Sequence, residues 1–184
     1  MELFKSLRIN QGARKLRKRA LKISRRRGFM NLSEVKQIGI VWDITSSDDL
    51  SPISDFILQM GERGIKVDVL GFFGEKVLPD RLTAIRYLKV LKREDFSFWY
   101  IPENKDVETF IGNGYDVLIE VCYRDFFPLR YVSTLSDARL KIGPGFNGDE
   151  LRKHADMLIE TGNNRSVRDY LREVLVYLDM IHTR

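Results

Sequence analysis

The chain has 184 residues, of which 43% are apolar, and its 31 lysines and arginines exceed its 26 acidic residues by five. This composition suits one globular domain with a full core, because a body of about 150 residues buries roughly 70% of its unfolded surface. No apolar run approaches the ~18 residues of a membrane span. The single cysteine, Cys122, excludes an intramolecular disulfide and indicates a reducing, cytoplasmic compartment.

The basic residues are concentrated at the N-terminus. Eleven of them lie within residues 1–28 together with one acid, Glu2, so this segment carries a formal charge of +10. The rest of the chain holds 20 basic and 25 acidic side chains, a net −5. We therefore divide the chain into a basic helical arm, residues 1–33, and an α/β domain, residues 34–184.

The arm is predicted to contain a helix over residues 14–27, which include neither proline nor glycine. Ala13, Leu16, Ala20 and Ile23 form an apolar stripe at helical spacing. Because no acid lies three or four residues from the surrounding cations, they repel one another, and the isolated helix is expected to be marginal in water. The candidate nucleic-acid contacts are Arg14, Lys15, Arg17, Lys18, Arg19, Lys22, Arg25, Arg26 and Arg27.

Several partners would relieve this repulsion. We favour RNA held by shape and charge, on a ribosome in particular, because arginine pairs with phosphates and stacks on exposed bases. The α/β body would then contribute shape or recruit a protein. An anionic membrane surface is an alternative, with Leu3, Phe4 and Leu7 as a short peripheral anchor. A third interpretation is that the apolar stripe packs on the acidic body, and a fourth is an organelle transit peptide.

The rest of the chain alternates between strand-like and helix-like segments. Strands are expected at 38–42, 65–73, 115–122, 139–142 and 157–160, and helices at 49–63, 106–112, 127–135 and 166–182. The spacing within 81–99 is ambiguous, and we interpret it as a strand. Residues 45–48 are expected to cap the first helix and residues 143–145 to form a turn. The alternation predicts a Rossmann-like α/β fold, a mostly parallel twisted sheet with helices on both faces.

Polar side chains follow two expected strands at the edge where open α/β sheets bind ligands. Asp43 ends the first strand, and Glu120, Tyr123 and Arg124 lie at the end of the strand at 115–122. If these strands are neighbours, Asp43 and Glu120 are a candidate ligand-binding or acid–base pair. The simpler interpretation is that each acid caps a helix or pairs with a cation such as Arg124.

The sequence lacks a catalytic signature, metal-ligand spacing and a nucleotide-binding motif. We therefore expect a binding protein in preference to an enzyme, with no cofactor and no metal. His154 and His182 are interpreted as surface histidines near helix ends, and Cys122 as a small buried hydrophobe.

An aromatic cluster precedes the helix expected at 106–112. Phe96, Phe98, Trp99 and Tyr100 lie within five positions of one another. Such a cluster can stack on nucleic-acid bases, but the simpler interpretation is that it belongs to the core.

Several strings of the body resemble a known family. YDVLIEVCYRDFFPLRYVSTLSDARLKIGPG, with IGIVWD, VDVLGFFGEKVLPD, WYIPE and ADMLIE, resembles a family of small Bacteroidota proteins that is described only as a domain of unknown function. The resemblance covers roughly residues 36–182 and implies a cytoplasmic bacterial α/β protein with a basic leader. Residues 115–120 and 141–143 are also similar to the N-terminal half of heptosyltransferase-like glycosyltransferases, which need a second Rossmann-like domain for the nucleotide-sugar.

Overall fold

Six parallel strands form a single sheet in the computed structural model, which describes residues 2–46, 50–74, 82, 85, 87–145, 153–160 and 166–182. The strand order is β3-β2-β1-β4-β5-β6. The strands are β1 (Gln37–Asp43), β2 (Lys66–Phe72), β3 (Leu88–Leu91), β4 (Val117–Val121), β5 (Leu140–Gly145) and β6 (Met157–Glu160). This is the strand order of the doubly wound Rossmann fold, so the predicted fold class is confirmed.

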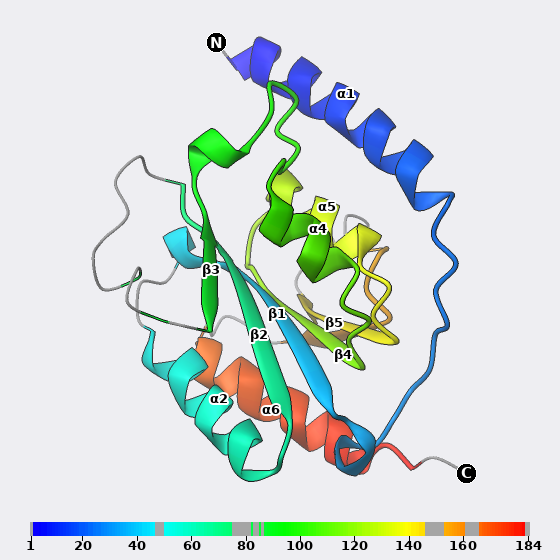
Figure 1. Cartoon of the computed structure of the whole chain (residues 1–184), viewed down its shortest axis with the longest axis vertical. Helices are drawn as coiled ribbons and strands as arrows, with labels where there is room; N and C mark the ends of the chain where they lie inside the picture. Colours follow the sequence, from blue (N-terminus) through cyan, green and yellow to red (C-terminus); the bar gives the residue numbers. More distant parts are fainter. Residues whose placement is uncertain are drawn as a thin grey trace.

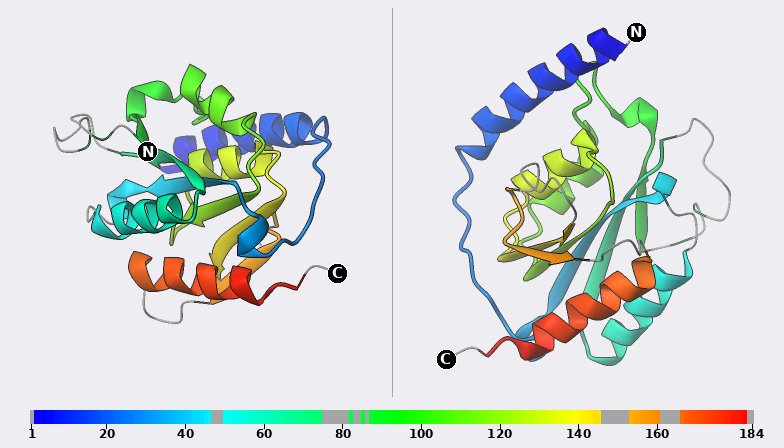
Figure 2. Two further views of the ribbon diagram at one scale, coloured as in Figure 1. Left: turned by 60° about the horizontal axis from the view of Figure 1, so that its bottom comes forward. Right: turned by 180° about the vertical axis from the view of Figure 1, so that it is seen from behind.

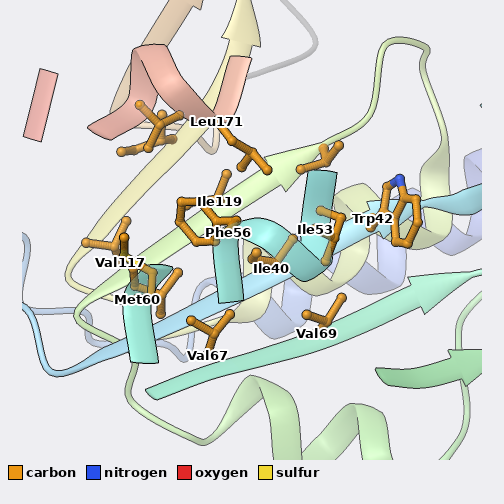
Figure 3. Packing of buried hydrophobic residues seen from close by; sticks show 14 of the residues in the cluster. Ile40, Trp42, Ile53, Phe56, Met60, Val67, Val69, Val117, Ile119 and Leu171 are labelled. Atoms are coloured by element: carbon orange, nitrogen blue, oxygen red, sulfur yellow. The ribbon is translucent and has the colours of Figure 1, made fainter. Parts of the chain in front are cut away.

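Helices cover both faces of the sheet (Figure 2). One face carries α1 (Glu2–Ala20), α4 (Lys105–Ile111) and α5 (Phe127–Leu135), and the other carries α2 (Ser51–Glu62) and α6 (Val167–Met180). Residues of β1 and β4 are buried on both faces, as expected for central parallel strands. In Figure 3, Ile40 and Ile119 of these strands lie with Phe56 of α2 and Leu171 of α6 in one core.

Local sequence signals explain most helix boundaries. Ser166 caps α6, since its side chain accepts a hydrogen bond from the Asp169 backbone N–H at 3.2 Å. Asn104 caps α4 in the same way through the Asp106 N–H at 2.9 Å. Pro52 lies in the first turn of α2, where its missing N–H costs nothing.

Two local predictions were wrong, and a third holds over a shorter range than expected. The N-cap of α2 is Leu50, which makes no side-chain hydrogen bond. Thr45 and Ser46 belong instead to a separate 3-10 helix, η2 (Ile44–Ser46), and the other two expected cap residues, Ser47 and Asp48, lie outside the described residues. Gly143–Gly145 continues β5 and is no turn: the ladder with β4 stops at Ile142, so Pro144 needs no N–H on that side. The strand expected within 81–99 is only Leu88–Leu91; residues 75–81, 83, 84 and 86 lie outside the described residues.

The arm helix is longer and earlier than predicted. It spans Glu2–Ala20, a turn follows at residues 21 and 22, and residues 23–31 then run along the molecule without regular structure to η1 (Leu32–Glu34), a 3-10 turn at the far end (Figures 1 and 2). The apolar stripe packs on the body as one interpretation expected: Leu16 is 7% exposed, and Ala13, Ala20 and Ile23 contact the same core cluster. The charges of the helix repel one another, so it is tertiary packing that stabilises the helix.

A glycine sets how closely α1 approaches the body. A Cβ atom on Gly12 would lie 2.4 Å from the Trp99 carbonyl oxygen and 2.8 Å from the Phe127 ring. Distances this short are not tolerated between non-bonded atoms, so only glycine fits at this contact.

The Gly12→Ala substitution is expected to destabilise the protein even though alanine favours an isolated helix by about 1 kcal/mol. The matched control is Gly61→Ala in α2, where an added Cβ meets nothing within 4 Å. We expect Gly61→Ala to raise the melting temperature by about 2–4 °C per kcal/mol gained and Gly12→Ala to lower it. Thermal denaturation followed by circular dichroism measures both, and an equal rise in the two variants would contradict the close contact.

Candidate functional site

The strand order reverses between β1 and β4, which is where ligands bind in folds of this type. The two strands are paired in register from Ile38 with Val117 to Trp42 with Val121. Side chains alternate along a strand, so Asp43 and Glu120 lie on the face that Val41 and Leu118 share, the one covered by α5. The topology thus brings the two predicted acids to one edge and one face.

Asp43 is fully buried, and its charge is compensated within the protein. Arg124 binds it in a bidentate manner, with Nε on Oδ2 and Nη2 3.0 Å from Oδ1, while Thr45 donates to Oδ1 at 2.7 Å. The Arg124 guanidinium also stacks over Phe126, 4.6 Å from the ring centroid. This carboxylate raises the pKa of Arg124. The simpler interpretation, in which Asp43 pairs with Arg124, is confirmed.

Glu120 pairs with His154, which the sequence analysis interpreted as a surface histidine. Its Oε2 lies 2.7 Å from Nε2 of His154, and the two side chains are only 7% and 8% exposed. The prediction of a surface His154 was wrong, because the segment before β6 brings this side chain over the end of β4. No sequence signal links positions 34 residues apart. His182 is exposed just after α6, as expected.

Tyr123 does not join these residues. Its ring packs on Tyr170 with centroids 6.3 Å apart, and its hydroxyl donates to the Ser166 carbonyl at 3.4 Å, on the face covered by α2 and α6. Cys122 is 1% exposed and its thiol lies 3.2 Å from the Arg124 carbonyl oxygen, so the prediction of a buried cysteine is confirmed.

The strand edge therefore holds two buried carboxylates with partners inside the protein. Asp43 binds Arg124, whose side chain is 49% exposed, and Glu120 lies against the buried His154 ring. The described part of the chain contains no group of three or more His, Cys, Asp or Glu that could hold a metal ion. A ligand that took the place of these pairs on Asp43 or Glu120 would have to displace Arg124 or His154. Breaking a buried ion pair is costly because it leaves an uncompensated charge.

The nine predicted contacts of the arm fall into two groups. Arg19 pairs with Glu108, its Nη1 2.9 Å from Oε1, while Arg25 and Arg27 share Asp156. The other six are exposed and, within the described residues, have no carboxylate partner: Arg14, Lys15, Arg17, Lys18, Lys22 and Arg26. The arm is thus only partly neutralised by its own body.

Three of the exposed cations share one surface of α1. Arg14, Arg17 and Lys18 are spaced three and four residues apart, so they lie together on a helix face. The buried Leu16 marks the opposite side, which packs on the body. We call the surface of Arg14, Arg17 and Lys18 the α1 ridge.

A buried lysine lies beneath the extended segment that follows α1. Lys141 in β5 is 4% exposed, and its ammonium donates to the Thr134 carbonyl oxygen at 3.1 Å. Burial, together with the nearby Arg25, lowers the pKa of Lys141 to about 7. Asp156 accepts from the Lys141 backbone N–H at 2.9 Å and binds Arg25, which ties the arm to β5. The sequence offered no signal for this cluster.

Lys141 makes stability depend on pH. The unfolded lysine titrates near 10.5 and the folded one near 7, so between these values the unfolded state binds the extra proton and stability rises with pH. We expect the free energy of unfolding of the wild type to rise from pH 7 to pH 10 relative to that of Lys141→Met. Urea denaturation at several pH values measures the difference, and parallel curves for the two proteins would contradict a neutral buried lysine.

The aromatic cluster divides between core and surface. Phe96 packs on Phe72 and Phe126, with centroids 6.2 and 6.4 Å away, so the core interpretation holds for this ring. Phe98 is 62% exposed, and for this ring the core interpretation was wrong. Trp99 and Tyr100 are half-buried against α1.

No helix among the described residues is long and apolar enough to cross a membrane. The model of a protein family described as a family of unknown function (DUF6913) matches residues 8–181, which include most of the arm and the whole sheet. Comparison with curated proteins gives no match.

Proposed function

The chain belongs to this family of unknown function. We propose that it is a non-enzymatic protein that binds RNA through the α1 ridge and associates with the ribosome. The observation that carries the proposal is the exposure of Arg14, Arg17 and Lys18 on a helix already docked by its opposite face. Cations without an internal carboxylate partner gain most from phosphates, because neutralising phosphates releases counterions.

Docking of α1 supports the proposal in a second way. A helix that folded only on binding would lose part of its interaction energy to ordering. Here Leu16 and Gly12 already hold the helix on the body, so its cations are presented without that cost. Arg19, Arg25 and Arg27 serve this docking and are not proposed as contacts to RNA.

The test is the salt dependence of binding. Arg14→Gln, Arg17→Gln and Lys18→Gln are combined in one variant, and binding to a fluorescent RNA is followed by anisotropy between low and high salt. Loss of about three phosphate contacts is expected to lower affinity at low salt and to reduce the slope of log K against log salt by about 2–3.

A matched variant controls for net charge. Arg93, Lys36 and Lys105 are exposed on the body and have no ion pair in the described part of the chain. Their combined change to glutamine removes the same charge and is expected to leave most of the affinity in place. Equal losses in the two variants would show that only the overall charge matters and would contradict an α1 site. Co-sedimentation with ribosomes, wild type against ridge variant, then tests the ribosomal setting.

Exposed apolar side chains favour a second candidate, attachment to an anionic membrane. Phe4 and Leu7 near the start of α1 are 75% and 60% exposed, and their spacing places them on the side of the helix that carries Arg14 and Lys18. This candidate expects the protein to float with phosphatidylserine vesicles and Phe4→Ser with Leu7→Ser to abolish flotation. Wild-type protein that stays unbound to such vesicles would exclude it.

Ligand binding or sugar or nucleotide handling at the strand edge is a weaker alternative. Asp43 and Glu120 lie at the switch point of the sheet, which favours it, but each acid is already paired inside the protein. A ligand there must offer a group that replaces the Arg124 guanidinium or the His154 ring.

A further inference from the structure

The turn that carries Phe98 reaches up to α1 (Figure 1). Ser97 donates its N–H to the Ile101 carbonyl at 2.8 Å, and Phe96 and Pro102 form an antiparallel bridge beneath it. Tyr100 within the turn has a φ of 59°, in the left-handed region that aromatic residues rarely adopt. Such a conformation is strained and persists only where the surroundings hold it. The turn is therefore tight and rigidly supported.

Arg8 of α1 holds the aromatic rings of this turn. Its guanidinium carbon lies 4.1 Å from the centroid of Phe98 and 4.8 Å from that of Tyr100, and its Nε donates to the Phe98 carbonyl at 2.6 Å. Trp99 meets the Phe98 ring edge-on at 4.9 Å. The Arg8 guanidinium and the Trp99 ring thus fix the orientation of the Phe98 ring, although Phe98 is 62% exposed.

An exposed but oriented phenyl ring is not explained by core packing. The ring gains little from burial, and a flexible surface side chain would not need the contacts that Arg8 and Trp99 supply. An aromatic face held beside arginine is instead the combination that proteins use to bind single-stranded nucleic acids, since every base can stack on such a face.

The α1 ridge and this ring are neighbours along α1 but lie on different sides of the helix. Arg14 follows Arg8 by six residues, about 9 Å along the helix axis and about 120° around it. Lys15, on the same side as Arg8, lies over the Trp99 ring at 5.5 Å and leads from the turn toward the ridge. The surface therefore offers a stacking face at one end and cations beyond it. In a duplex the bases are stacked on each other and are not available to such a ring.

We propose that Phe98, backed by Arg8, is a stacking site for one base of a single-stranded nucleic acid whose phosphates contact the α1 ridge. This inference rests on the proposed function and adds the class of nucleic acid, single-stranded over duplex. The bases are held by ring stacking without hydrogen bonds that read their identity, so the site is tolerant of sequence.

The experiment measures anisotropy of three fluorescent probes with the full-length protein. They are a single-stranded RNA of about 12 nucleotides, an abasic strand of equal length, and an RNA duplex. Phe98→Ala is expected to lower affinity for the single strand about tenfold and to leave the abasic strand and the duplex unchanged. Phe98→Trp should retain single-strand binding. Phe29, 58% exposed in the extended segment, supplies the matched control Phe29→Ala, which should have no effect.

Three results would overturn the stacking site. An equal loss on the abasic strand would mean that Phe98 only positions α1, and an unchanged single-strand affinity would mean that no base contacts the ring. Phosphatidylserine vesicles serve as a fourth probe. If Phe98→Ala lost binding to these vesicles while its RNA binding stayed that of the wild type, the ring would be assigned to a membrane. If duplex and abasic strand bind through the α1 ridge while Phe98→Ala has no effect, the proposed function stands without the stacking site. If the wild type binds no RNA at all, both fail.

Discussion

The contact between the apolar side of α1 and the body is the interaction on which the rest of this structure depends. Like charges along the arm repel one another, and the helix has few acids to offset them. Burial of Leu16 and the close approach at Gly12 outweigh this repulsion. Because the packing is apolar, it uses few of the cations, and the ridge of Arg14, Arg17 and Lys18 stays on the outside. The same packing places Arg8 beside Phe98.

Ion pairs complete the docking at the far end of the arm. Asp156 receives Arg25 and Arg27, and the burial of Lys141 behind them lowers its pKa to about 7, which limits the positive charge that collects there. Asp43 and Glu120 are compensated in a comparable manner at the strand edge. The buried carboxylates Asp43 and Glu120 thus have partners inside the domain, while Arg14, Arg17 and Lys18 keep their positive charge on the surface of α1.

The sequence predicted one of the two strand-edge pairs and missed the other for a physical reason. Asp43 ends β1 and Arg124 comes three residues after β4, so their meeting follows once β1 and β4 are neighbours. His154 lies in the segment before β6, and the residues next to it in the sequence do not predict the direction that this segment takes. The sequence named Phe98 within an aromatic cluster, but the core interpretation was wrong for this ring, because exposed and buried phenylalanines look alike in a sequence and only the fold separates Phe98 from Phe96.

By itself the sequence determined the alternation of strands and helices, the Rossmann-like class and the separation of charge between arm and body, because these follow from periodicity and composition along the chain. Only the tertiary structure decided which cations of the arm are paired and which are exposed, how far α1 extends, and which groups meet Glu120 and Lys141. Those outcomes depend on contacts between residues far apart in the chain, whose free energies arise only when the elements pack.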